Sequence, residues 1–227
     1  MNEIQLYYIE QGEGQPLILL HGNGENCDYF EHQIPYFSSN YRVIAIDTRG
    51  HGKTPRGVKP FTIKQFAEDL HDFMDEKGIA KAILLGFSDG GNIALEFALK
   101  YPERVEKLVL NGANLFPSGV KPRYQWPIEI GYHIAKLFSK KSKEAKRNTE
   151  LLGLMVNEPH IDPSELGRLT MPVLVISGKK DMIKELHTKL IYKSLPNAQL
   201  NIIEGDHFIA EKNPETFNNV VEHFLEK

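Results

Sequence analysis

One stretch, residues 83–92, limits the folds open to this chain more than any other. An apolar run ends in the pattern Gly-x-Ser-x-Gly, and residues with helical spacing follow at once. The pattern predicts a buried strand that turns sharply into a helix, with Ser88 at the apex. Gly86 and Gly90 leave room for the turn, because a side chain there would collide with neighbouring backbone. The helix would direct its free N–H groups towards the Ser88 hydroxyl.

The short pattern is not decisive by itself. A chain with 18 glycines would contain Gly-x-Ser-x-Gly by chance in about one sequence in twenty. An ordinary glycine-rich turn is therefore the alternative explanation. The strand that precedes the pattern and the helix that follows it favour an exposed, reactive serine.

Composition limits the class of protein. At 227 residues the chain is long enough for one domain with a sizeable core. A net charge of −3 argues against a nucleic-acid or anionic-membrane surface. The single cysteine, Cys27, excludes an internal disulfide and a cysteine metal cluster, and we expect it to be a small buried apolar residue.

The N-terminal segment gives an expectation about location. Residues 1–8 alternate polar and apolar side chains and lack the basic and apolar regions of a signal peptide. No apolar run approaches the length needed to span a membrane. We therefore expect a cytoplasmic protein.

Strand and helix patterns alternate along most of the chain. The predicted strands occupy residues 4–9, 16–20, 41–46, 81–85, 105–110, 173–176 and 199–203. The predicted helices occupy residues 27–37, 63–74, 93–101, 183–194 and 214–225. This alternation predicts an α/β fold, a mostly parallel sheet flanked by helices and joined by right-handed crossovers.

The alternation fails between residues 115 and 169. Three prolines break the start of this segment, and residues 128–138 then have helical spacing. Residues 140–147 are rich in lysine and arginine, which favours a solvated helix face over an anion site. We predict a single domain with a core of residues 1–114 and 170–227 and a short helical cap of residues 115–169.

Two later strand ends carry groups that could activate a serine. Asp181 follows the strand at 173–176, and His207 follows the strand at 199–203. A serine hydroxyl needs a base to take its proton, and the base needs an orienting acid. Because ligands of parallel sheets bind at the carboxyl ends of the strands, we expect these two side chains to converge on Ser88.

The chain resembles the α/β-hydrolase superfamily, in particular its small, cap-bearing esterase- and lipase-like serine hydrolases. The order serine, aspartate, histidine is the order of that fold. Five motifs at strand ends carry the resemblance nearly from end to end: residues 21–24, 47–52, 86–91, 178–181 and 205–207. Together the motifs are specific for the superfamily but not for a substrate.

The resemblance implies an enzyme that cleaves a small ester, thioester or amide without a cofactor or a metal ion. His207 would take the proton of Ser88, and Asp181 would orient His207. The backbone N–H groups of Asn23 and Asp89 would form the oxyanion hole. The same triad could instead serve C–C bond hydrolysis, perhydrolysis or acyl transfer, and a non-catalytic small-molecule receptor of this fold stays open.

The side chain of Asp89 has two interpretations. It could be a carboxylate stabilised at a helix N-terminus, or an anion beside the nucleophile that binds a cationic group such as the ammonium of an amino ester. Trp126 could place an aromatic ring over Ser88 or form the core of the cap. The expected partner is a small acyl substrate, with no nucleic acid and no membrane, and the sequence leaves the oligomeric state open.

Other histidines and carboxylates compete for the same roles. His21 and His51 lie in two of the motif loops, where the resemblance favours bracing of the backbone over catalysis. Glu204 and Asp206 flank the predicted base, but their positions in the chain direct them away from it. No carboxylate follows the strand at 105–110, which leaves Asp181 as the predicted orienting acid.

Overall fold

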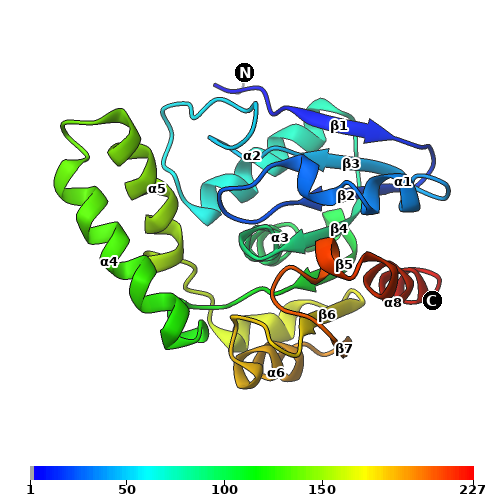
Figure 1. The fold of residues 1–227 in the computed structure, drawn as a ribbon. Coiled ribbons are helices and arrows are strands. Elements are labelled where there is room, and N and C mark those ends of the chain that lie inside the picture. The colour runs from blue at the N-terminus through cyan, green and yellow to red at the C-terminus, as the bar shows by residue number, and fades with distance from the viewer. Residues whose placement is uncertain (1–2) are drawn as a thin grey trace.

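A seven-stranded sheet forms the centre of the molecule in this computed structural model, which describes residues 3–227 (Figure 1). Residues 1 and 2, part of the segment that lacks signal-peptide features, lie outside that range. The strand order is β1-β3-β2-β4-β5-β6-β7, with only β1 antiparallel to its neighbour. The strands are β1 (Tyr8–Gln11), β2 (Pro16–Leu20), β3 (Arg42–Ile46), β4 (Ala82–Phe87), β5 (Val105–Asn111), β6 (Val173–Gly178) and β7 (Ala198–Ile203). The predicted α/β fold is confirmed.

The central strands are apolar throughout because both of their faces are buried. In β2, Leu17 and Leu19 join one core cluster, whereas Ile18 and Leu20 join the cluster on the opposite face. All four are almost fully buried. Continuous apolar runs of this kind are typical of parallel strands that are covered on both sides.

Helices cover both faces of the sheet (Figure 1). One core cluster contains the apolar sides of α2 (Ile63–Glu76), α3 (Asp89–Lys100) and α6 (Glu185–Ser194). The other contains α1 (Gln33–Phe37), α7 (Ile209–Lys212) and α8 (Pro214–Leu225). The sheet is therefore the middle of three layers, as expected for strands joined by helical crossovers.

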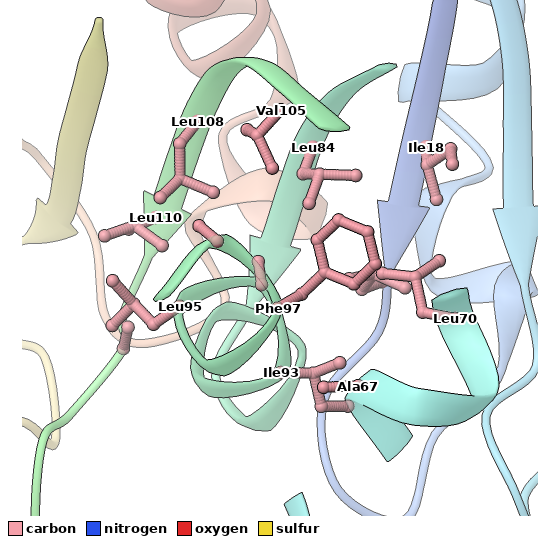
Figure 2. Packing of buried hydrophobic residues seen from close by; sticks show 14 of the residues in the cluster. Ile18, Ala67, Leu70, Leu84, Ile93, Leu95, Phe97, Val105, Leu108 and Leu110 are labelled. Carbon is pink, nitrogen blue, oxygen red and sulfur yellow. The ribbon is translucent and has the colours of Figure 1, made fainter. Parts of the chain in front are cut away.

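Helix α3 is anchored by its own apolar side chains. Figure 2 shows Phe97 among residues of the sheet and of α2, with Leu84 and Leu70 on either side. Phe97 has no exposed surface, and burying a side chain of this size contributes roughly 2 kcal/mol or more. This packing fixes the helix that begins directly after Ser88.

Helix α2 begins at the predicted residue, Ile63, and extends two residues beyond the predicted end, to Glu76. The Thr62 hydroxyl caps the helix by accepting a hydrogen bond from the Gln65 N–H. After the helix, Gly78 adopts a φ of +65°, a conformation that glycine adopts without strain.

The first strand begins later than the alternating pattern predicts. The structure starts β1 at Tyr8 rather than at Ile4, although the side chains of Ile4 and Leu6 are buried. The backbone just before Tyr8 bonds to a loop instead of the sheet. The Tyr7 N–H donates to the Thr54 hydroxyl at 2.8 Å. Alternating burial in this segment therefore does not require strand pairing.

Two helices fill the region where the strand pattern fails. They are α4 (Pro122–Phe138) and α5 (Lys143–Asn157), which pack on each other and are flanked by the 3-10 turns η3 (Pro117–Gly119) and η4 (Pro163–Arg168). The described chain places no strand of the sheet between β5 and β6. The limits of the cap at residues 115 and 169 stay a prediction.

The prolines of this region do not all break the helix, so that expectation is wrong for two of them. Pro122 is the first residue of α4, where the missing N–H costs nothing. Pro127 lies inside α4. Because Arg123, whose carbonyl would accept from residue 127, is exposed, water can take that hydrogen bond.

Candidate active site

Ser88 occupies a strained turn between β4 and α3. Its φ of 52° and ψ of −119° make it the single non-glycine residue with positive φ in the range 3–227. Such a conformation typically costs 1–3 kcal/mol, so the surrounding structure must impose it. The sequence prediction of a sharp strand-to-helix turn with this serine at its apex agrees with the observed geometry.

Two glycines make the turn possible. A Cβ atom on Gly86 would lie 2.3 Å from the carbonyl oxygen of Gly90, and one on Gly90 would lie 1.9 Å from the carbonyl oxygen of Leu20. Both contacts involve backbone atoms that cannot move aside. No other amino acid fits at either position.

The side chains of Ser88, His207 and Asp181 lie in line. His207 Nε2 is 3.0 Å from Ser88 Oγ, and His207 Nδ1 is 2.7 Å from Asp181 Oδ1. Asp181 follows β6 and His207 follows β7, so the carboxyl ends of parallel strands bring them together. One imidazole nitrogen can therefore receive a proton from the hydroxyl while the other donates to the carboxylate.

Asp181 is held in place by more than the imidazole. Its Oδ1 also accepts a hydrogen bond from the Ile183 N–H at 2.9 Å, and the Lys121 ammonium donates to its backbone carbonyl. The carboxylate is 2% exposed, which strengthens its electrostatic interaction with the imidazole.

The other two carboxylates near the histidine have their own partners. Glu204 pairs with Lys179, and Asp206 pairs with Lys212 at 2.6 Å. Both pairs lie at the surface. They are therefore not available to orient the imidazole.

Two residues that the sequence did not single out shape the position of His207. The ring of Phe87 lies 4.9 Å from the imidazole, centroid to centroid. A Cβ atom on Gly112 would lie 2.7 Å from His207 Cε1, and Gly112 has a φ of +63°. A glycine directly after a buried strand was the available signal for this close approach.

The two backbone groups predicted to form an oxyanion hole belong to segments that pack together. Close contact of Gly90 with Leu20 and His21 places the start of α3 against the loop that follows β2. The N–H of Asp89 is the first of α3, and within residues 3–227 neither it nor the N–H of Asn23 has a hydrogen-bond acceptor. Free donors at a helix N-terminus favour a negatively charged oxygen.

The carboxyl group of Asp89, the residue after Ser88, is buried. Burial raises its pKa to about 6, and the side chains of Asn23 and Asn92 oppose that shift. Asn92 Nδ2 lies 3.2 Å from its Oδ1, whereas Oδ2 is buried and has no hydrogen-bond partner in the described part of the chain. Of the two carboxyl oxygens, only Oδ1 therefore has a hydrogen-bond partner in the described part of the chain.

His21 and His51 connect loops behind the site. His21 Nδ1 lies 2.7 Å from the Gly22 carbonyl, while Nε2 accepts from the Thr48 N–H at 3.1 Å. These partners assign the neutral tautomer with the proton on Nδ1. Burial lowers the pKa of both histidines, that of His51 to about 4. Both rings contact backbone groups, as the bracing role requires.

Glu25, which the sequence did not single out, lies in the loop that follows β2. Burial raises the pKa of Glu25 to about 7, and hydrogen bonding with the Gly22 backbone opposes the shift only in part. Glu25 Oε2 is buried without a hydrogen-bond partner in the described chain. The neighbouring Tyr29 stacks on Phe87, with the ring centroids 4.3 Å apart. Nothing in the local sequence pattern indicated this burial.

The helical hairpin contacts the site through its second helix. Asn23 Nδ2 donates to the Leu151 carbonyl of α5 at 2.7 Å. Trp126 on α4 is 66% exposed, so it is not the core of the cap, and its role in substrate binding stays a prediction. Cys27 is buried, as expected. In residues 3–227 no three histidine, cysteine or acidic side chains converge to hold a metal ion.

Comparison with known proteins gives the family. The model of the alpha/beta hydrolase fold matches residues 15–132, which is more than half of the chain. The chain belongs to the alpha/beta hydrolase family. No helix within residues 3–227 is both long enough and apolar enough to cross a membrane.

The chain is similar to several named enzymes and to several solved structures. Serine hydrolase BPHL of Homo sapiens is 29% identical over 252 residues, which cover 100% of this chain and 84% of that protein. A meta-cleavage product hydrolase of Pseudomonas fluorescens IP01 is 26% identical, with a TM-score of 0.80 and coverage of 98% and 94%. The enol-lactonase of Burkholderia xenovorans LB400 matches the fold with a TM-score of 0.84 at 20% identity, over 100% and 98% of the two chains. The protein is an enzyme of the alpha/beta hydrolase type.

Proposed function

We propose that this alpha/beta hydrolase cleaves a small ester, thioester or amide through an acyl-enzyme on Ser88. The observation that carries the proposal is the continuous contact from Ser88 Oγ to His207 Nε2 at 3.0 Å and from His207 Nδ1 to Asp181 Oδ1 at 2.7 Å. A hydroxyl, an imidazole and a buried carboxylate in this order form the minimal set for nucleophilic acyl transfer.

Acylation begins when Ser88 Oγ attacks the acyl carbonyl carbon. His207 Nε2 accepts the hydroxyl proton, and the buried Asp181 carboxylate stabilises the imidazolium and fixes its orientation. The carbonyl oxygen becomes an oxyanion and receives hydrogen bonds from the backbone N–H groups of Asn23 and Asp89. One such donor is typically worth about 3 kcal/mol in the transition state.

The tetrahedral intermediate collapses when the bond to the leaving group breaks. The imidazolium of His207 protonates the departing oxygen, sulfur or nitrogen, which leaves the acyl group on Ser88. Water then enters, loses its proton to His207 and attacks the ester carbonyl. Release of the acid regenerates the serine hydroxyl, so no cofactor is consumed.

The same three side chains support other reactions. C–C bond hydrolysis, perhydrolysis and acyl transfer differ in the bond broken or in the group that attacks, and a non-catalytic receptor would bind without turnover. The relatives include enzymes named for meta-cleavage products and enol-lactones. We favour hydrolysis of a small ester, thioester or amide because the free N–H groups beside Ser88 suit the oxyanion of acyl transfer.

Labelling with a fluorophosphonate probe, followed by assay of p-nitrophenyl esters of varied chain length, tests the proposal. We expect the probe to modify Ser88 and the esters to be hydrolysed, with both signals lost in Ser88→Ala. Folded protein that neither reacts nor turns over these esters would favour the receptor. Labelling of Ser88 without ester hydrolysis would favour one of the other reactions, which analysis of the products separates.

For Asp89 we propose a role in substrate selection. Its buried Oδ2 has no hydrogen-bond partner within residues 3–227 and lies on the residue next to the nucleophile, where an ammonium group of an amino ester would satisfy it. Esters with and without an α-amino group should be compared in the wild type and in Asp89→Asn. We expect the wild type to prefer the amino ester and the variant to lose the preference; equal ratios in both proteins would exclude the role.

A further inference from the structure

Helix α4 exposes large apolar side chains along its length. The structure describes eight large hydrophobic residues as exposed, and six of them lie on this one helix. Five of the six form what we call the α4 stripe: Trp126, Ile130, Ile134, Leu137 and Phe138, which are between 53% and 78% exposed. Soluble proteins seldom expose apolar side chains in contiguous groups without a binding partner.

The α4 stripe occupies one side of the helix. At about 100° per residue, its five side chains fall within an arc of about 120°. The opposite side packs on α5, where a Cβ atom on Gly131 would lie 3.4 Å from Leu152 and one on Gly153 would lie 3.4 Å from Tyr132. Figure 1 shows the hairpin at the edge of the fold with α5 on the side nearer the sheet. The stripe therefore faces away from the protein.

The hairpin that carries the stripe is strongly basic. Residues 121–150 contain eight lysine and arginine residues and three glutamates, a net charge of +5 in a chain whose net charge is −3. The whole-chain charge, on which the expectation of no membrane partner rested, therefore conceals a basic region. Cations lie at both ends of the stripe, with Arg123 at one end and Lys140 and Lys141 at the other.

This charge pattern disfavours a second copy of the chain as the occupant. A parallel pair of α4 helices would place each basic end beside the same basic end of the partner helix. An antiparallel pair would place Arg123 beside Lys140 and Lys141 of the partner helix. Both arrangements bring like charges together, so the occupant is expected to be anionic as well as apolar.

We propose that the α4 stripe and its flanking lysines bind the surface of an anionic lipid bilayer. Apolar side chains with Trp126 among them would enter the boundary between headgroups and acyl chains, and the lysines would contact lipid phosphate and carboxylate groups. The helix would lie in the plane of the interface rather than cross the bilayer. This binding does not depend on the proposed chemistry at Ser88.

Sedimentation with phosphatidylcholine vesicles, with and without phosphatidylserine, tests the proposal on the full chain. We expect binding to the vesicles that contain phosphatidylserine, at least about tenfold weaker binding to phosphatidylcholine alone, and loss of binding as salt rises from about 0.1 M to about 0.5 M. Removal of two stripe side chains in Ile134→Ser/Leu137→Ser should weaken binding by about tenfold or more. Reversal of two charges in Lys140→Glu/Lys141→Glu should do the same.

Matched variants control for general effects of apolar loss and charge reversal. Val58→Ser/Leu186→Ser removes two exposed apolar side chains outside the stripe, and Lys81→Glu/Lys193→Glu reverses two exposed charges outside the hairpin. Both control proteins should bind vesicles as the wild type does. Absence of binding to phosphatidylserine vesicles, or equal binding by the stripe variant, would overturn the proposal. A concentration-dependent dimer in light scattering that disappears in the stripe variant, without vesicle binding, would identify a second copy instead.

Discussion

Gly90 approaches Leu20 so closely that a Cβ atom on the glycine would lie 1.9 Å from the leucine carbonyl oxygen. The start of α3 thus rests directly on the end of β2. This contact places the first N–H of the helix beside the loop that contains Asn23. The position of the proposed oxyanion donors relative to Ser88 therefore depends on Gly90 having no side chain.

We expect Gly90→Ala to lower both stability and activity. The added methyl group meets backbone that cannot rotate away, so α3 must shift, at a cost of more than about 2 kcal/mol in the free energy of unfolding. Misplaced oxyanion donors should lower kcat/KM for an ester by about a hundredfold or more. Gly167→Ala is the control, because a Cβ there has no heavy atom within 4 Å. Denaturant unfolding should change by less than about 0.5 kcal/mol in this control. Equal losses in the two variants would contradict the steric argument.

Strain at Ser88 predicts a difference in stability between two inactive variants. Glycine accepts a φ of 52° without strain, whereas alanine does not. Ser88→Gly should therefore raise the free energy of unfolding by about 1 kcal/mol relative to Ser88→Ala, while both variants lose hydrolysis. Thermal or denaturant unfolding of the pair isolates the backbone effect, since both lack the hydroxyl. A glycine variant no more stable than the alanine variant would show that the turn is unstrained.

Replacing Asp181 by asparagine should reduce turnover more than binding. The amide can still occupy the pocket, but it stabilises the wrong tautomer of His207 and no longer balances the imidazolium. We expect kcat for an ester to fall by about 10⁴-fold, with KM changed far less. Glu204→Gln is the comparison, because that carboxylate pairs with Lys179 at the surface and should leave kcat unchanged. A comparable loss in both variants would remove Asp181 from its proposed role.

The sheet was predictable from the sequence because burial leaves a strong signature in parallel strands. Val173 to Ile176 and Ile83 to Leu85 read as uninterrupted apolar runs, and the structure buries both faces of each strand. The chemistry-bearing residues directly follow such runs. Because these strands are parallel, the ends that carry Ser88, Asp181 and His207 lie along the same edge of the sheet.

Features that depend on contacts between distant segments were not predictable. Glu25 lies in a polar loop whose composition favours exposure, yet its Oε2 is buried near Gly22, where the ring of Phe87 also lies. The exposed side of α4 was equally hidden. Apolar residues occur around much of this helix, so periodicity could not separate the face that packs on α5 from the α4 stripe.

The buried carboxyl group of Glu25 predicts a specific pH dependence of stability. Its pKa rises from the ordinary 4.5 to about 7 in the folded protein, so between these values the folded chain holds a proton that the unfolded chain has lost. The contribution of this carboxyl group to the free energy of unfolding therefore falls as pH rises through that window and then levels off. Glu25→Gln mimics the protonated side chain and removes the fall. Its melting temperature relative to the wild type should therefore rise from about pH 4.5 to about pH 8.

Subtracting wild type from variant isolates Glu25, because the raised pKa of Asp89 affects both proteins in the same sense and cancels. Glu13→Gln supplies the matched control, since Glu13 is exposed in the turn between β1 and β2. The difference in melting temperature between Glu13→Gln and the wild type should stay flat over the same range. A flat difference for Glu25→Gln as well would mean that its carboxyl group is solvated in solution. The loop between Gly22 and Tyr29 would then have to open far enough to admit water beside His207.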